Sequence, residues 1–163
     1  MRFYSARECE KWLDDRERQK PDAISGIPVE RVRFPPTFGR LFFFAQWISS
    51  SLTFRMPALL WITEWGIWGP GNSHLYYRLR QSYGDQRLLD EAPGHLFLEH
   101  ESEDLASFLQ LSILNGWGGY LLTQADYVNL FFSHDEYIDF YAKVYNLAEI
   151  RKGLGIERPS RTG

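Results

Sequence analysis

The sequence predicts an α+β fold, a single domain in which a mixed or largely antiparallel sheet packs with about five helices. The length of 163 residues suits one domain with one core. Short segments typical of strands are interspersed with segments that have apolar residues at helical spacing. No internal repeat, low-complexity tract or linker divides the chain. We therefore expect a domain over residues 1–152 and a flexible C-terminal tail over residues 153–163.

The N-terminal segment predicts an amphipathic helix. Ser5 and Glu8 have the spacing of a capping box, in which each side chain accepts a hydrogen bond from the backbone amide of the other. Cys9, Trp12 and Leu13 then form a short apolar stripe among charged residues. We interpret Cys9 as a small buried hydrophobic residue, since a reactive thiol needs basic neighbours near a cleft.

The next two segments are a strand and a longer apolar run. Apolar and basic residues alternate before Pro35 and Pro36, as in a half-exposed strand. The nearly continuous apolar run that follows fits either a buried strand or a helix. Thr37 as a cap and the helical spacing of the apolar residues favour a helix over residues 39–52.

The stretch EWGIWGPGNSHLYYRL raises the question of whether it forms a ligand site or only a turn. We predict a strand over residues 58–68, covered on both faces, and a helix from Asn72 or Ser73 to Gly84. The apolar stripe of this helix is expected to contain the four residues Leu75, Tyr76, Leu79 and Tyr83. The glycines, the proline and the cap explain the turn without a ligand.

Five further elements are predicted in the second half of the chain. A helix capped by Ser102 closes at Asn115 and Gly116. The spacing of Ser133 and Glu136 predicts another capping box and a helix over residues 135–150, with a strand at 136–141 as the alternative. The remaining predicted elements are short strands at residues 95–99, 119–123 and 127–132.

Glu64 is the best candidate for acid–base chemistry. On a strand beside Trp61, Trp65 and Trp68, its carboxyl group would have a raised pKa and could act as a general acid. Glycoside hydrolysis needs a second carboxylate, and no nearby residue provides one. A hydrogen-bonded structural glutamate is therefore the favoured interpretation, and no catalytic residue is assigned.

The histidines do not predict a metal site. None of the four lies in a helical i, i+4 pair or in a close cluster with Cys9. His95 and Glu99 would share a strand face able to bind zinc, but an exposed polar strand edge explains them equally well. His134 offers a base beside two acids, but we interpret it as part of a helix start. No metal ion and no cofactor are therefore expected.

Aromatic residues are the main departure from ordinary composition. They make up 17% of the chain, more than a core of this size requires, so some rings are expected at the surface. The net charge is −3, which argues against nucleic acid as a partner. Acids dominate residues 85–150 and would attract a basic partner. The single cysteine, the charged N-terminal segment and the short apolar runs favour a cytoplasmic protein that does not enter the membrane.

One segment carries a resemblance to known proteins. The stretch GWGGYLLTQADYVNLFFSHDEYIDFYAK contains a hydrophobic hairpin that leads into a Ser-His-Asp step. It resembles the C-terminal part of small single-domain bacterial proteins of uncharacterised function, among them toxin-immunity proteins. The resemblance implies a cytosolic bacterial protein that binds another protein and brings no catalytic residues. The pI of about 5.8 departs from a strongly acidic inhibitor.

These observations favour a protein-binding module over an enzyme. It would be an immunity-type inhibitor or an accessory protein of a bacterial or phage system, acting by occlusion with aromatic anchors and acidic steering. One alternative is a small-ligand or carbohydrate-binding domain that uses exposed tryptophans. Another is an enzyme with Glu64, His74 and His95 around a cleft. The candidate binding residues are Glu64, Trp65, Trp68, Asn72, His74 and Trp117.

Overall fold

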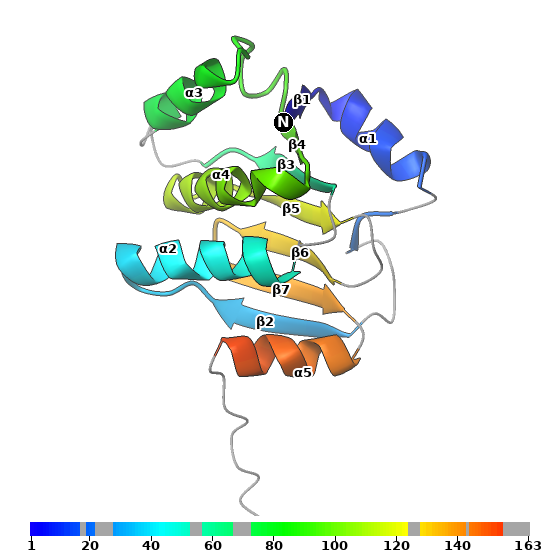
Figure 1. The fold of residues 1–163 in the computed structure, drawn as a ribbon, viewed down its shortest axis with the longest axis vertical. Helices are drawn as coiled ribbons and strands as arrows, with labels where there is room; N and C mark the ends of the chain where they lie inside the picture. Colours follow the sequence, from blue (N-terminus) through cyan, green and yellow to red (C-terminus); the bar gives the residue numbers. More distant parts are fainter. Residues whose placement is uncertain are drawn as a thin grey trace, which may run out of the picture.

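The computed structural model describes residues 1–16, 19–21, 28–52, 57–66, 73–123, 128–142 and 144–154. Within these ranges a seven-stranded sheet packs with five α-helices (Figure 1). Every pair of neighbouring strands is antiparallel. The predicted α+β fold is therefore confirmed.

The sheet places strands from distant parts of the chain side by side. Its order is β1-β4-β3-β5-β6-β7-β2, so the two strands nearest the N-terminus form its opposite edges. Strand β3 lies next to the central strand β5 and pairs with β4 and β5. The strands are β1 (Arg2–Tyr4), β2 (Val29–Arg33), β3 (Ala58–Glu64), β4 (Gly94–Phe97), β5 (Gly118–Thr123), β6 (Val128–Ser133) and β7 (Tyr137–Ala142).

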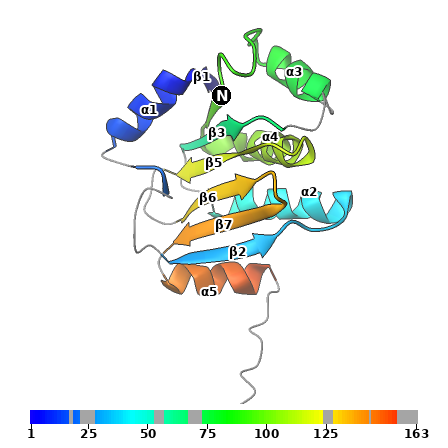
Figure 2. The same ribbon diagram turned by 180° about the vertical axis from the view of Figure 1, so that it is seen from behind.

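The helices cover the two faces of the sheet unequally. Helices α2 and α4 lie side by side on one face, α1 lies on the other, and α5 lies beside the β2 edge (Figures 1 and 2). A π-helix, η2, continues α2, and a short 3-10 helix, η3, precedes α4. The helical bounds are α1 (Ala6–Asp14), α2 (Phe38–Trp47), η2 (Ile48–Leu52), α3 (Ser73–Ser82), η3 (Glu99–Glu101), α4 (Ser102–Leu114) and α5 (Val144–Gly153).

Two apolar cores lie on the two faces of the sheet. The larger one joins α2 and α4 to alternate side chains of the central strands, among them Leu60, Leu121 and Phe140. The smaller one packs Cys9 and Trp12 of α1 against β3, β4 and β5. Because both faces are covered there, β3 is buried over most of its length, as expected for a central strand.

The predictions for the N-terminal half rest on local signals and are largely confirmed. Ser5 and Glu8 form the capping box of α1, with the amide of Ser5 donating to the Glu8 carboxylate at 2.7 Å. Cys9 is fully buried. Burial and the charges of neighbouring acids raise the pKa of its thiol to about 12, so the thiol stays protonated. Thr37 caps α2, accepting from the amide of Arg40 at 3.4 Å.

In the second half, the β5–β6 hairpin is confirmed, and α4 ends at Leu114 with Asn115 as its C-cap and Gly116 at φ +65°, as predicted. The prediction that Ser102 caps α4 is wrong. Ser102 is the first residue of the helix, because η3 leads directly into α4 and the residue before the helix is Glu101. The predicted helix over residues 135–150 is also wrong in its first half. Residues 137–142 form β7, and α5 begins only at Val144.

The physical reason for the β7 difference is the turn before it. The amide of Glu136 donates to the carbonyl of Ser133 at 3.2 Å, and Glu136 adopts φ +65°, which no helix start allows. The carbonyl of Glu136 accepts from the amide of Phe34 at 2.9 Å, at the end of β2. The chain therefore returns as a hairpin strand between β6 and β2, which is the alternative that the sequence left open.

Three other predictions need correction or fall outside the described residues. The strand predicted for residues 58–68 ends at Glu64, and residues 67–68 are not among those described. The strand predicted for residues 95–99 ends at Phe97 because the chain enters η3, so His95 and Glu99 do not share a strand face. Residues 155–163, most of the expected tail, are also outside the description.

The apolar stripe predicted for α3 is only partly correct. Tyr76 is buried, but Leu75 and Tyr83 are exposed. The second buried side chain of α3 is Arg80, which has no exposed surface. Its guanidinium pairs with the carboxylate of Asp85 just beyond the helix, so a charged side chain lies beside Tyr76 on the buried side of α3.

Candidate functional site

The end of β3 brings Glu64 close to a histidine. Nδ1 of His134, in the β6–β7 turn, lies 2.9 Å from Oε2 of Glu64. The hydrogen bond to Glu64 raises the pKa of His134, and the charge of Asp135 acts in the same direction. Opposite Glu64, Gly118 leaves room for the carboxylate, because a Cβ there would lie 2.3 Å from its oxygen. The sequence did not reveal that His134 is the partner of Glu64, because His134 was interpreted as part of a helix start.

The Glu64–His134 pair does not have the environment expected of a buried acid–base pair. The side chains of Glu64 and His134 are 44% and 39% exposed, so water reaches both. A pocket of about 640 Å³ lies elsewhere, between β1 and α1, and is lined by Tyr4, Trp12 and their neighbours. The hydrogen bond therefore connects the end of β3 to the β6–β7 turn, which agrees with the interpretation of Glu64 as a hydrogen-bonded structural residue.

The candidate tryptophans beside Glu64 mainly build the core. Trp65 and Trp117 meet edge to face, with ring centroids 4.9 Å apart. Trp117 also packs at 4.9 Å against Tyr76 and is buried, so its ring offers no open surface to a ligand. Trp65 is half-buried. Trp68 and Asn72 lie outside the described residues.

The other two histidines considered for catalysis are not gathered around Glu64. His74 is exposed on α3, and no hydrogen bond or ion pair within the described ranges joins it to Glu64. His95 is fully buried, which overturns the exposed strand edge predicted for it. Its Nε2 lies 3.2 Å from the hydroxyl of Tyr76. The three residues of the enzyme alternative therefore do not form one cleft.

The clearest unpartnered feature is an exposed cluster of phenylalanines on α2. Phe38, Phe42 and Phe43 are 77%, 43% and 69% exposed. At 100° per residue, Phe42 and Phe43 face away from Leu41 and Phe44, which are buried against the sheet, and Phe38 is the first residue of the helix. The rings of Phe42 and Phe43 meet edge to face at 5.5 Å. We call Phe38, Phe42 and Phe43 the phenylalanine patch.

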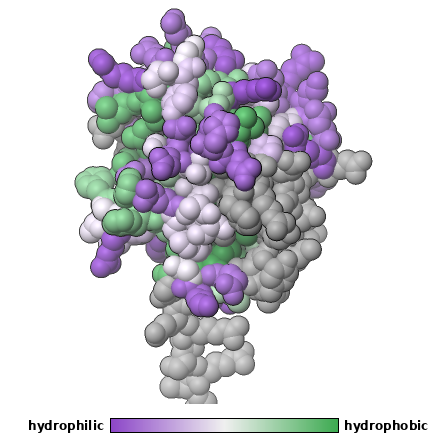
Figure 3. Space-filling view, viewed as in Figure 1, coloured by the Kyte–Doolittle hydropathy of each residue, from purple (hydrophilic) through white to green (hydrophobic). Residues whose placement is uncertain are grey.

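The phenylalanine patch stands out from the polar surface around it. Figure 3 shows an apolar cluster at the N-terminal end of α2. Gly39 lies between the rings on the same side of the helix, and a Cβ there would meet nothing within 4 Å. The patch is therefore notched. Sequence reasoning predicted surplus exposed rings, but placed them on tryptophans and did not single out the phenylalanines of this helix.

The acidic stretch around residues 85–104 is divided between interior and surface. Asp85 is buried and pairs with Arg80 and Arg87, so it adds nothing to an acidic face. The exposed acids lie in the α3–β4 connection and around the start of α4, at the opposite end of the helical layer from the start of α2. These residues are Asp90, Glu91, Glu99 and Glu103.

Comparison with known proteins gives no further guide to function. No protein-family model, curated protein or solved structure matches the chain. No helix in the described part of the chain is both long and apolar enough to cross a membrane. Among the same residues, no group of three or more histidine, cysteine or acidic side chains is arranged to hold a metal ion.

Proposed function

We propose that this protein is a protein-binding module, and that the phenylalanine patch is the centre of its binding surface. The supporting observation is the exposure of Phe38, Phe42 and Phe43 on one side of one helix. Burying a phenylalanine contributes about 1.5–3 kcal/mol, and aromatic anchors dominate the centres of protein interfaces. Three adjacent rings held on a rigid helix therefore supply the core of an interface at little entropic cost.

The notch at Gly39 indicates how a partner would fit. The two rings of Phe38 and Phe42 lie on one side of it and the ring of Phe43 on the other. A partner helix could place an apolar side chain into this notch while its neighbours pack against the rings, as in helix-to-groove recognition. The partner would then be a protein with an apolar ridge on its surface.

Occlusion is the mechanism that this surface favours. An immunity-type inhibitor, or an accessory protein of a bacterial or phage system, would cover the working surface of its partner with such a patch. The exposed acids Asp90, Glu91, Glu99 and Glu103 lie outside the patch. They would speed the approach of a basic partner without contacting it in the complex, so the association rate would fall as salt is added.

A photo-crosslinking amino acid at Phe43, in cells that naturally contain the protein, tests this proposal. We expect a crosslink to one other protein. Isolated, that partner should bind the wild type at least tenfold more tightly than Phe38→Ser or Phe43→Ser, a change of about 1.4 kcal/mol or more. Leu88→Ser is the matched control, because Leu88 is 56% exposed but lies outside the patch.

Three outcomes would overturn the proposal. A crosslink that joins only copies of this chain would make the patch a self-association surface. The absence of any crosslink would remove the evidence for a partner. Finally, equal binding of the isolated partner to the patch variants and to the control would place the contact elsewhere.

A further inference from the structure

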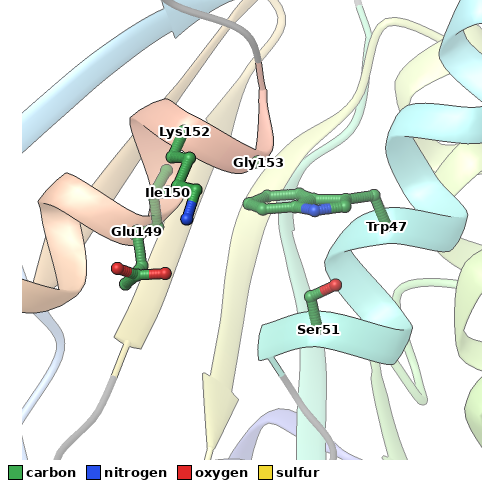
Figure 4. A pocket seen from close by; sticks show the side chains of 6 residues that line it. All are labelled: Trp47, Ser51, Glu149, Ile150, Lys152 and Gly153. Atoms are coloured by element: carbon green, nitrogen blue, oxygen red, sulfur yellow. The ribbon is translucent and has the colours of Figure 1, made fainter.

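A second pocket opens between the end of α2 and the end of α5. Its volume is about 400 Å³. Figure 4 shows its two walls, with Trp47 and Ser51 on one side and the last turns of α5 on the other. The α5 wall is formed by Glu149, Ile150, Lys152 and Gly153. None of these residues belongs to the phenylalanine patch, so the pocket is a separate feature of the protein.

The helix geometry at this pocket is unusual. The α-helical pattern of α2 ends at Trp47 and continues as the π-helix Ile48–Leu52, which contains Ser51. A π-helix is wider than an α-helix and less well packed, and short π segments occur frequently at functional sites. In this protein the change of helix type coincides with the wall of the pocket.

The indole of Trp47 lies directly against Gly153, in the opposite wall of the pocket. A Cβ at Gly153 would lie 2.4 Å from Cζ2 of the ring and 2.8 Å from its nitrogen. Only glycine therefore lets the two walls approach this closely. Ile150 lines the base of the pocket but is packed into the core, so it closes this end of the pocket without offering open surface. The flat ring of Trp47, which is half-buried, is therefore the apolar surface that the pocket offers.

The polar groups in the pocket have no partners of their own. Within the described ranges, Ser51, Glu149 and Lys152 form no hydrogen bond or ion pair. One carboxylate and one ammonium group therefore line the same space, and their charges cancel overall. The pocket also lies at the C-terminal end of α5, where the helix dipole favours a positive group on a ligand near Glu149.

We propose that this pocket binds a small zwitterion with a flat apolar group, the chemistry of an aromatic α-amino acid. The ligand's ammonium group pairs with Glu149, and its carboxylate pairs with Lys152 and accepts from the hydroxyl of Ser51. Its ring packs against the indole of Trp47. The volume falls within the range of small-molecule sites, which are about 300–1,000 Å³. A ligand of a single charge would leave one charged group of the pocket without a partner.

Binding is tested with three probes of nearly equal size. L-phenylalanine carries both charges, phenethylamine lacks the carboxylate, and 3-phenylpropionate lacks the ammonium group. The indole NH resonance of Trp47, assigned with Trp47→Phe, reports binding at this pocket. We expect L-phenylalanine to bind with a Kd of about 1 mM or tighter and each of the other probes at least tenfold more weakly.

Two charge-removing variants distinguish the proposed contacts. Glu149→Gln should weaken binding of L-phenylalanine at least tenfold while leaving 3-phenylpropionate unchanged. Lys152→Gln should also weaken the binding of L-phenylalanine at least tenfold and should leave the binding of phenethylamine unchanged. Glu10→Gln removes an exposed acid on α1, which covers the other face of the sheet, and should change nothing. Because all three side chains are exposed, none of these variants should prevent folding.

The proposal fails if the Trp47 resonance does not move at about 20 mM L-phenylalanine, a concentration well above the expected Kd. It also fails if the three probes bind equally, because the charges would then play no part. Equal binding of L-phenylalanine to both charge variants and to the control would overturn it in the same way.

Discussion

The hydroxyl of Tyr76 lies 3.2 Å from Nε2 of His95, and both side chains are fully buried. The rings of Phe3 and Phe108 lie 5.2 and 5.0 Å from the imidazole. Burial lowers the pKa of His95 to about 3, and the charge of Arg80 acts in the same direction. His95 is therefore a neutral core residue at physiological pH.

This burial predicts a loss of stability in mild acid. Between pH 6.5 and about 3, the unfolded chain binds a proton at His95 that the folded chain does not. The contribution of His95 to the free energy of unfolding should therefore be constant above pH 6.5 and fall below it, by up to about 1.4 kcal/mol per pH unit. Urea unfolding of the wild type and His95→Gln between pH 7 and pH 5 measures the difference.

In His95→Gln this part of the pH dependence should disappear, while the amide still offers a partner to Tyr76. His100→Gln is the control, since the side chain of His100 is 78% exposed. Parallel stability profiles for the wild type and His95→Gln would contradict the prediction.

His134 should have the opposite effect on stability. Its pKa is raised by Glu64, so the folded chain holds this proton more tightly than the unfolded chain. The stabilisation is complete below pH 6.5 and is lost as the pH rises through the raised pKa. An NMR titration of the His134 ring should give a lower pKa in Glu64→Gln than in the wild type. Asp90→Asn, a change of an exposed acid elsewhere, should leave the titration unaltered.

Gly39→Ala should stabilise the protein by about 0.5–1 kcal/mol, because glycine in a helix costs this much relative to alanine. The added Cβ meets nothing within 4 Å. The contrasting variant is Gly119→Ala, whose Cβ would lie 2.3 Å from the carbonyl oxygen of Trp61 and 2.9 Å from the Cα of Ile62. Since both are backbone atoms, we expect Gly119→Ala to lower stability by about 1–3 kcal/mol. Denaturant unfolding that showed the reverse order would refute both expectations.

Asp85→Ala should be strongly destabilising. It leaves the fully buried Arg80 without its counter-charge, and breaking a buried ion pair costs about 3–5 kcal/mol. Arg80→Met combined with Asp85→Ala should cost less than the two single changes added together, because no buried charge then remains. A double-mutant cycle measures this coupling. Asp90→Ala, an exposed neighbour, should stay within about 0.5 kcal/mol of the wild type.

Elements with local signals could be predicted from the sequence. The capping box of Ser5 and Glu8 fixes the start of α1 within four consecutive residues, and Thr37 does the same for α2. The apolar segments of β5 and β6 are separated by a short connection, so their pairing needs only neighbouring residues. In each case the information lies within a few positions of the element it determines.

Strand β7 could not be predicted because its pattern fits two structures. Its apolar residues satisfy both helical spacing and strand alternation, and the decision comes from its partners. Arg31 donates two hydrogen bonds of 2.7 Å to the buried carboxylate of Asp139, across 108 positions of sequence. This ion pair, between facing residues of β2 and β7, gives Asp139 a partner that no local reading reveals.

The same limit applies to the candidate sites. Glu64 was singled out from its neighbours in sequence, but its hydrogen-bond partner His134 is 70 positions away. The pocket at Trp47 depends on residues near 150, and its glycine has no distinguishing context in the sequence. The phenylalanine patch was not predicted as a site, although the helix predicted over residues 39–52 already places Phe42 and Phe43 away from Leu41 and Phe44.

The position of β1 and β2 at the two edges of the sheet bears on the order in which a ribosome completes this fold. Both strands leave the exit tunnel before their partners, because β1 pairs with residues 94–96 and β2 with residues 137–141. Translation must therefore pass residue 141, more than 100 positions after β2, before β2 can pair along its whole length. Until then, the nascent polypeptide carries an unpaired strand of the kind that chaperones bind and that aggregation exploits.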